Sequence, residues 1–131
     1  SESKTYGRII FESFDWKDER LIDLLSATVG TPGYKHYMAL HNDQPVAAAA
    51  LHVTDIYGSM AFAGTLPKYR GLGGQSLLLK TRILDAQKLG CKYLISETAE
   101  HTEEKPVASF RNMRKFGFEL AYLRENWIFE F

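Results

Sequence analysis

This sequence has very little cysteine and no excess of charge of either sign. Cys91 is the single cysteine among 131 residues. No disulfide can form within the chain, which indicates a reducing compartment. Sixteen basic residues balance sixteen acidic ones, so the formal net charge is zero. No overall field therefore favours nucleic acid or an anionic membrane as a partner.

Long hydrophobic runs are missing as well. No apolar run approaches the ~20 residues that a transmembrane helix needs. The start of the chain carries neither a signal peptide nor an initiator Met. We therefore expect a cytoplasmic protein that is either processed or cut from a longer chain. The hydrophobic content of 45% and the charged content of 24% are ordinary for a globular protein. We expect a single domain over residues 1–131, with a core of its own.

Two common phosphate-binding motifs are also absent. A dinucleotide fingerprint would need a third glycine where Ser76 stands, and the Gly-Lys-Ser/Thr of a P-loop does not occur. Three glycines instead occupy four positions at residues 71–74, between a strand-like run at 59–65 and a helical pattern at 76–89. The first N–H groups of a helix lack intrahelical partners, and glycine lets an anion come close to them. This stretch predicts a phosphate site, with an ordinary tight turn as the alternative.

The N-terminal segment predicts few elements. Residues 1–5 are typical of a frayed tail, and the run 8–11 is typical of a short strand. Asp15 is the expected N-cap of one amphipathic helix, which Gly30 and Gly33 should end.

The middle of the chain predicts an antiparallel meander that leads into a βαβ unit. The expected elements are strands at 34–41, 45–54 and 56–65, a helix at 76–89 and a buried parallel strand at 91–96. The run Ala47–Ala50 would by itself favour helix, but the flanking turn and β-branched residues favour strand. Its small side chains would leave room for a neighbouring helix or a ligand.

The C-terminal part predicts a loop, a helix and a hairpin. Residues 97–105 form the expected acidic loop. Pro106 should open the last helix and Gly117 should close it. The segments 120–123 and 127–131 should then pair as a closing hairpin.

Two motifs carry a resemblance to a known family. Arg70-Gly71-Leu72-Gly73-Gly74-Gln75 is similar to the coenzyme A loop of the GNAT N-acetyltransferase superfamily, (Gln/Arg)-x-x-Gly-x-(Gly/Ala), with Gln75 where glycine or alanine is typical. Residues 109–118 resemble the family's final helix. The resemblance covers residues 34–131 and leaves 1–33 as a short, atypical N-terminal arm. It implies an α/β (α+β) fold, with a GNAT-like mixed, largely antiparallel sheet and a central βαβ coenzyme-binding unit.

This resemblance implies an acyl-CoA-dependent N-acyltransferase. Acetyl-CoA would be the acyl donor, and a small-molecule or peptide amine would be the acceptor. The pantetheine arm is assigned to the strand around 63–65, and the pyrophosphate to the N–H groups of 71–76. The predicted coenzyme-binding residues are Ala63, Gly64, Thr65, Arg70, Gly71, Leu72, Gly73, Gly74, Gln75, Ser76, Ser109 and Asn112. No metal site is expected, and a homodimer is left open.

Glu97 is the candidate general base. It stands at the C-terminal end of a predicted parallel strand, where α/β sheets commonly place their ligands. A partly desolvated carboxylate there is poised to accept a proton. The alternative is a solvated residue at the end of a strand. His52, Glu100 and His101 are weaker candidates.

The position of the general acid departs from the family. The resemblance implies a tyrosine four residues before Gly117, and Met113 stands there. Three further apolar residues recur with Met113 at a spacing of three, which indicates core packing: Val107, Phe110 and Phe116. Tyr69 and Tyr122 are alternative donors. Two alternative functions follow, a catalytically degenerate domain that binds acyl-CoA as a sensor or scaffold, and the GNAT half of a longer enzyme.

Acidic residues crowd into the loop after the last predicted parallel strand: Glu97, Glu100, Glu103 and Glu104. A negative rim attracts ammonium groups, so the loop predicts a cationic amine acceptor. A plain solvated loop is the alternative.

Overall fold

The computed structural model describes all residues from 1 to 131. The chain divides into two compact units, residues 1–96 and residues 97–131. The first unit contains α1 (Glu2–Ser13), α2 (Arg20–Ala27), β1 (Tyr34–His41), β2 (Gln44–Thr54), β3 (Tyr57–Thr65), a 3-10 turn (Pro67–Tyr69), α3 (Gly74–Lys88) and β4 (Tyr93–Ile95). The second unit contains α4 (Ala108–Lys115).

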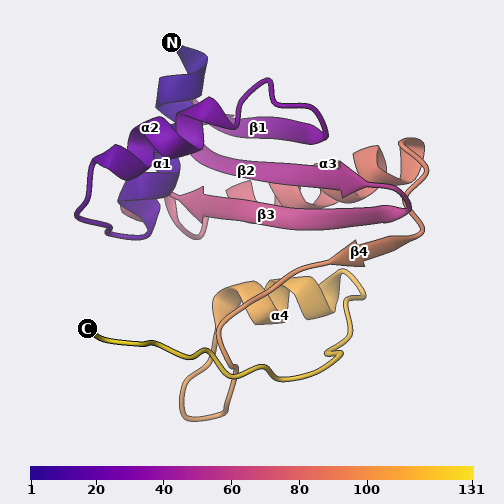
Figure 1. Cartoon of the computed structure of the whole chain (residues 1–131). Helices are drawn as coiled ribbons and strands as arrows, with labels where there is room; N and C mark the ends of the chain where they lie inside the picture. The colour runs from indigo at the N-terminus through magenta and orange to yellow at the C-terminus, as the bar shows by residue number, and fades with distance from the viewer. The chain divides into compact units, whose positions relative to one another are not determined.

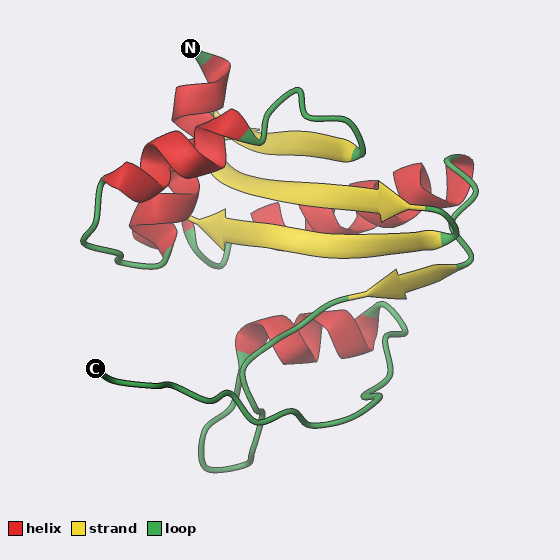
Figure 2. Cartoon of the chain, in the orientation of Figure 1, coloured by secondary structure: helices red, strands yellow, loops and turns green.

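The first unit is built on a four-stranded sheet in the order β1-β2-β3-β4 (Figures 1 and 2). The pairs β1–β2 and β2–β3 are antiparallel, and β3–β4 is parallel. Asn42 and Asp43 turn the first hairpin with positive φ angles of 48° and 62°, as type I′ turns require. The predicted meander, the βαβ unit and the mixed, largely antiparallel sheet are therefore confirmed.

Helices cover both faces of this sheet, α1 and α2 on one face and α3 on the other (Figure 1). Successive side chains of a strand point to opposite faces. Ala48 and Ala50 pack with α1 and α2, whereas Ala47 and Ala49 pack with Leu78 of α3. All four alanines are fully buried. The alanine run is thus a strand, as predicted, and its small side chains let helices approach from both sides.

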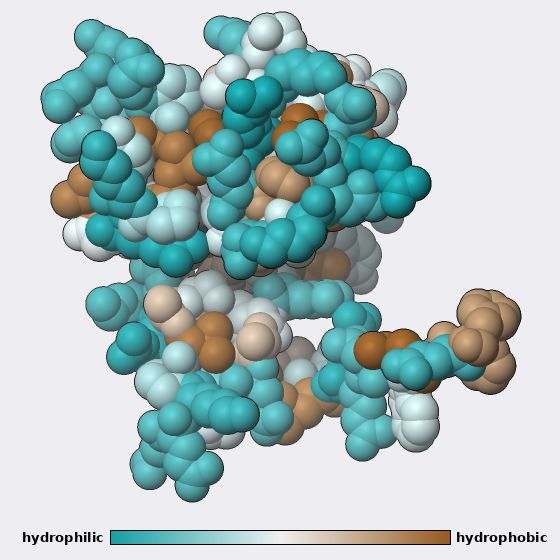
Figure 3. Space-filling model, turned by 90° about the vertical axis from the view of Figure 1, so that its left-hand side faces the viewer, coloured by the Kyte–Doolittle hydropathy of each residue, from teal (hydrophilic) through white to brown (hydrophobic).

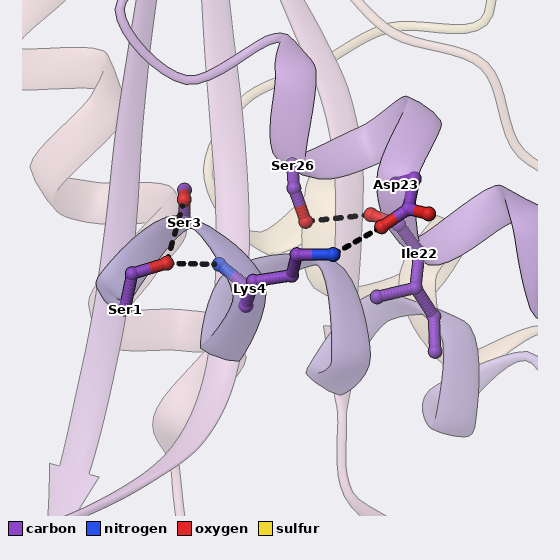
Figure 4. Close-up of polar contacts among 6 residues, drawn as sticks. All are labelled: Ser1, Ser3, Lys4, Ile22, Asp23 and Ser26. Atoms are coloured by element: carbon purple, nitrogen blue, oxygen red, sulfur yellow. Dashed lines mark hydrogen bonds and ion pairs between the residues drawn. The ribbon is translucent and has the colours of Figure 1, made fainter.

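The predictions for the first residues are wrong, because a helix replaces the frayed tail and the short strand. Tyr6, Ile9 and Ile10 are buried together in the core under α1, at the i, i+3, i+4 spacing of one helix face. The Ser1 side chain caps α1 by accepting a hydrogen bond from the Lys4 N–H (Figure 4). Asp15 is not an N-cap either. It lies between the helices with φ 52°, and α2 begins at Arg20.

The two N-terminal helices lie in close contact. Lys4 of α1 forms an ion pair with Asp23 of α2 (Figure 4). A Cβ placed on Gly7 would lie 2.5 Å from the Ser26 Oγ, and that hydroxyl donates to the Ile22 carbonyl at 2.6 Å. Gly7 therefore sets how closely α1 approaches α2.

The last strand is shorter and more exposed than expected. β4 spans only Tyr93–Ile95, and the Tyr93 side chain is 58% exposed. The prediction of a buried strand is wrong because β4 is the outer strand of the sheet and pairs only with β3.

The second unit holds α4 and the C-terminal segment. The Val107 N–H donates to His101 Nδ1 at 2.8 Å, so a histidine side chain caps the start of α4. Gly117 follows the helix with φ 95° and ends it, as predicted. The predicted closing hairpin is absent, and the Trp127 side chain is 88% exposed. Two short strands do not hold each other without a third strand or a helix to pack on.

The molecular surface seen in Figure 3 is mostly hydrophilic, with hydrophobic side chains scattered over it. No helix of the chain has both the length and the apolar character needed to cross a bilayer.

Candidate coenzyme site

The glycine-rich loop turns the chain from β3 into α3. The Leu66 N–H donates to the Val46 carbonyl at 2.9 Å, which fixes the start of the loop to β2. Gly71 and Gly73 then adopt φ angles of 80° and 85°, a region that glycine enters without a steric penalty. The sequence therefore needs glycine here to reverse the chain before the first turn of α3.

The backbone of this loop is unpartnered. The N–H groups from Gly71 to Gln75 donate no hydrogen bond within the chain. The Leu77 N–H, which donates to the Gly73 carbonyl at 3.0 Å, closes the first turn. A Cβ on Gly71 or Gly73 would meet no atom within 4 Å. Free N–H groups, the positive end of a helix dipole and open space together suit an anion such as a phosphate.

A small cavity lies beside the loop. Its volume is about 100 Å³, below the roughly 300–1,000 Å³ of ordinary small-molecule sites, so it takes at most a small part of a large ligand. The lining residues are Ala39, Leu40, His41, Val46, Thr65, Tyr69, Leu72, Gly73, Gly74 and Leu77.

The edge of β3 is open next to the loop. β3 pairs with β4 only from Tyr57 to Ser59, so from Met60 onward it has no strand partner on the β4 side. Phe62 is an extra residue in the pairing with β2, and its φ of 30° marks a β-bulge. The predicted pantetheine-binding residues Ala63, Gly64 and Thr65 follow the bulge, and the chain then enters the loop.

Two polar side chains of the predicted motif bind neighbouring elements. Arg70 Nη2 donates to the Ser13 carbonyl at the end of α1, at 2.8 Å. Gln75 Nε2 donates to Thr65 Oγ1 at 2.9 Å. Gln75 thus ties the first turn of α3 to the end of β3, a role that a glycine or alanine could not fill. Neither bond could be predicted from the sequence, because both acceptors lie on distant segments.

The remaining predicted site residues belong to the second unit. Glu97 pairs with Arg124 at 2.9 Å, and its side chain is 77% exposed rather than desolvated. Ser109 and Asn112 lie three positions apart in α4, on neighbouring positions of one helix face. Met113 is partly buried in the same helix.

The weaker candidates are scattered over the chain. The His52 ring packs on Tyr34 at 4.4 Å, and the His101 ring stacks on Phe110 at 4.6 Å. Tyr69 lines the small cavity, whereas Tyr122 is exposed.

The sequence from residue 4 to residue 118 matches the Acetyltransferase (GNAT) family. The chain belongs to this family. The match includes α1 and α2, which the motifs alone did not reach. Membership confirms the prediction of a GNAT-type N-acetyltransferase that takes acetyl-CoA as its acyl donor. No curated protein matches the chain.

Solved structures confirm the GNAT fold. An acetyltransferase of Trypanosoma brucei aligns with a TM-score of 0.72 at 15% identity, over 98% of this chain and 95% of the other. A predicted acetyltransferase of Clostridium acetobutylicum, solved with acetyl-CoA, aligns with a TM-score of 0.67 at 15% identity, over 96% and 92%. An aminoglycoside 6'-N-acetyltransferase of Acinetobacter haemolyticus aligns with a TM-score of 0.72 at 16% identity, over 100% and 95%.

A buried polar group of this GNAT domain escaped the sequence analysis. Arg82 of α3 is 1% exposed, and its Nη1 donates to the Ala50 carbonyl at 3.0 Å. Burial lowers the pKa of the Arg82 guanidinium to about 10. Nearby, burial and a 2.7 Å hydrogen bond to Asp85 raise the pKa of Tyr37, and the same bond lowers the pKa of Asp85. Helical periodicity predicts that position 82 is buried, but it does not predict which acceptor the arginine side chain bonds.

Proposed function

We propose that this GNAT domain transfers the acetyl group of acetyl-CoA to a cationic amine. The observation that carries the proposal is the row of N–H groups from Gly71 to Gln75. These groups have no partner within the chain, and they lie next to the open edge of β3. Coenzyme A has an anionic pyrophosphate, which suits the N–H groups of the loop. It also has an extended pantetheine arm, which suits the edge of β3.

The coenzyme contacts follow from that geometry. The pyrophosphate would accept hydrogen bonds from the N–H groups of residues 71–76, where the dipole of α3 adds a favourable field. The pantetheine amides would pair with the edge of β3 at residues 63–65, as an added strand does. Ser109 and Asn112 of α4 are further contacts in this proposal.

The reaction forms one bond and breaks one. The ammonium group of the acceptor first loses a proton, because only the free amine has a lone pair. The amine nitrogen then attacks the thioester carbonyl carbon, the C–N bond forms, and the C–S bond breaks with its electron pair on sulfur. The nitrogen loses its second proton, and the thiolate takes up one proton from it directly or through water, so the products are the N-acetylated amine and the free thiol of coenzyme A. Glu97 accepts the proton of the ammonium group in this proposal, and its exposed carboxylate lets acceptor or water reach it.

A cationic acceptor fits the charges of the second unit. Glu97, Glu100, Glu103 and Glu104 are all exposed and share one loop with a single basic residue, Lys105. Some similar structures are aminoglycoside N-acetyltransferases, and aminoglycosides carry several amino groups. This likeness supports an amine as the class of acceptor.

A sensor or scaffold that binds acyl-CoA without turnover is the second candidate. Met113 favours it, because a thioether at the usual tyrosine position cannot donate a proton to the leaving thiolate. A panel of cationic amines incubated with acetyl-CoA separates the two candidates. Acetylated amine in the mass spectrum supports the transferase, whereas coenzyme binding without any product supports the sensor.

Coenzyme binding can be tested with a matched pair of glycine variants. Acetyl-CoA at 100 times its Kd should stabilise the fold by about 2.7 kcal/mol. This corresponds to a Tm increase of roughly 10 °C for a chain of this length. Gly73→Val should abolish the increase, because its side chain would occupy the anion's place. Gly90→Val is the control, since Gly90 has a φ of 84° and the same open surroundings at the far end of α3.

Differential scanning fluorimetry of both variants, with and without coenzyme, gives the answer. The control should lose a similar amount of basal stability to backbone strain and keep the full Tm increase. A native protein whose Tm does not respond to saturating acetyl-CoA would exclude the proposed coenzyme site.

A further inference from the structure

The β-bulge in β3 interrupts the regular pairing of β3 with β2 between Ala49 and Ala50. Ala49 pairs with Ala63 and Ala50 pairs with Ala61, so Phe62 has no opposite residue. A bulge disrupts the ladder locally and bends its strand. The bulge also strains the Phe62 backbone, whose φ of 30° is one that residues other than glycine rarely adopt.

Arg82 reaches this point from α3. Its Nη1 donates to the Ala50 carbonyl at 3.0 Å, and its Nε donates to the Leu78 carbonyl at 3.3 Å. Neither acceptor is a carboxylate, so a guanidinium that is 1% exposed is held by carbonyl dipoles. Burying a charge without a counter-ion opposes folding. An apolar side chain would avoid this cost, but it could not donate to the Ala50 carbonyl beside the bulge.

The bulge separates the part of β3 that pairs with β4 from the part that we propose to bind the coenzyme. Before it, at Tyr57–Ser59, β3 pairs with β4, and after it come Ala63, Gly64 and Thr65 on the open edge. The direction of the backbone N–H and C=O groups on that edge depends on how the bulge bends the strand. Arg82 bonds to Ala50 of β2, which pairs with Ala61 directly before the bulge.

We infer that Arg82 is a positioning residue for acetyl transfer: it holds the bulge at Phe62 and thereby aims the β3 edge at the thioester end of the acyl donor. The inference rests on the proposed function. It predicts a defect in turnover rather than in anchoring the coenzyme, because the pyrophosphate contacts lie on the loop, beyond Thr65.

Arg82→Met tests this role with Leu79→Ala as the matched control. Leu79 is a buried residue of the same helix, so its truncation lowers stability without touching the Ala50 carbonyl. Arg82→Met should lower kcat by about 10- to 100-fold, the effect of a misplacement near 1 Å. Its Kd for free coenzyme A should stay within about threefold of the wild-type value. Leu79→Ala should keep wild-type kcat at temperatures where it is fully folded.

Arg82→Lys gives a second, milder variant. It keeps the positive charge and can still donate a hydrogen bond, but it lacks the planar guanidinium, so its kcat should lie between those of the wild type and Arg82→Met. If Arg82→Met does not fold, Arg82→Lys takes its place in the comparison with Leu79→Ala. A kcat of Arg82→Lys equal to that of Leu79→Ala would then overturn the inference.

Hydrogen exchange separates a failure of this inference from a failure of the proposed function. The amides of residues 60–65 should exchange faster in the Arg82 variant than in Leu79→Ala, without any ligand. Equal exchange in the two variants overturns the positioning role, even if the enzyme is active. Faster exchange in a protein that acetylates no amine keeps Arg82 as the holder of the bulge and removes only its part in catalysis.

Discussion

Individual glycines of this chain meet two opposite physical needs. Gly71 and Gly73 face open space with positive φ, so they serve backbone conformation and access. Gly7 and Gly64 have no positive φ, but an added Cβ would collide with Ser26 and Ser13 respectively. The second pair therefore serves packing, and the first pair leaves open space where we propose that the coenzyme binds.

Glu97 is the residue whose predicted role can be tested most directly. If it accepts the proton of the ammonium group, Glu97→Gln should lower kcat at neutral pH by about 10²–10⁴-fold. The Kd for acetyl-CoA should stay the same, since in this proposal the carboxylate contacts the acceptor and not the coenzyme. Steady-state kinetics and a binding titration measure the two quantities.

Arg124→Gln is the control for that experiment. It removes the partner of the 2.9 Å ion pair but leaves the Glu97 carboxylate in place. Exposed ion pairs contribute little to stability, so this variant should keep kcat within a few-fold. A Glu97→Gln enzyme with wild-type kcat and an unshifted pH profile would make Glu97 a surface residue.

At the scale of elements, the end of α1 contacts the loop of the proposed coenzyme site. Arg70 of the loop binds the Ser13 carbonyl at 2.8 Å. Gly64 of β3 lies so close to Ser13 that a Cβ would approach its Oγ to 1.8 Å and its Cβ to 2.6 Å. A helix, a strand and the loop therefore meet at one point. Ser13, Gly64 and Arg70 all lie within the residues that match the family.

Gly64→Ala should destabilise the fold through this contact. Overpacking of this kind costs about 1–3 kcal/mol, which is a Tm decrease of roughly 4–11 °C for this chain. Thermal unfolding of the variant measures the loss. The double variant Gly64→Ala/Ser13→Gly removes both colliding atoms, so the cost of the second substitution should be less than additive. Strict additivity of the two losses would contradict the packing role of Gly64.

At the scale of the whole molecule, positive and negative charges cancel, but they are not evenly distributed along the chain. The net charge is zero, so no long-range field steers a substrate toward the protein. The exposed glutamates of the 97–104 loop nevertheless form a local negative region in the second unit. Fields from exposed charges act over about 8–10 Å at moderate salt, so this region would act on a cationic acceptor only within that range.

Converting Glu100, Glu103 and Glu104 together to Gln tests this local field. The triple variant should raise KM for a cationic amine and flatten the dependence of KM on ionic strength. Kinetics at several salt concentrations provide the measurement.

The control removes the same charge from the first unit, at the exposed residues Glu2, Glu12 and Glu19. It should leave KM and its salt dependence unchanged. If both triple variants behave alike, the 97–104 loop has no part in recognising the acceptor.

The sequence by itself determined the features that depend on neighbouring residues. The hairpin at Asn42–Asp43, the meander, the glycine loop and the start of α3 each need particular backbone angles within a few positions, and residue types reveal such needs. The Arg70–Gln75 motif could likewise be recognised, because its residues are consecutive in the sequence. Family membership followed from the same local signals.

Only the tertiary structure decided which distant groups meet. The helix at residues 2–13 forms because Tyr6, Ile9 and Ile10 find a sheet to pack on. The segment 120–131 contains no strand, although its sequence pattern predicts two. The partners of Arg70, Gln75 and Arg82 lie on other elements: Ser13, Thr65 and Ala50. A buried donor must find an acceptor, but sequence pattern cannot name it, since the choice depends on how helices and strands pack.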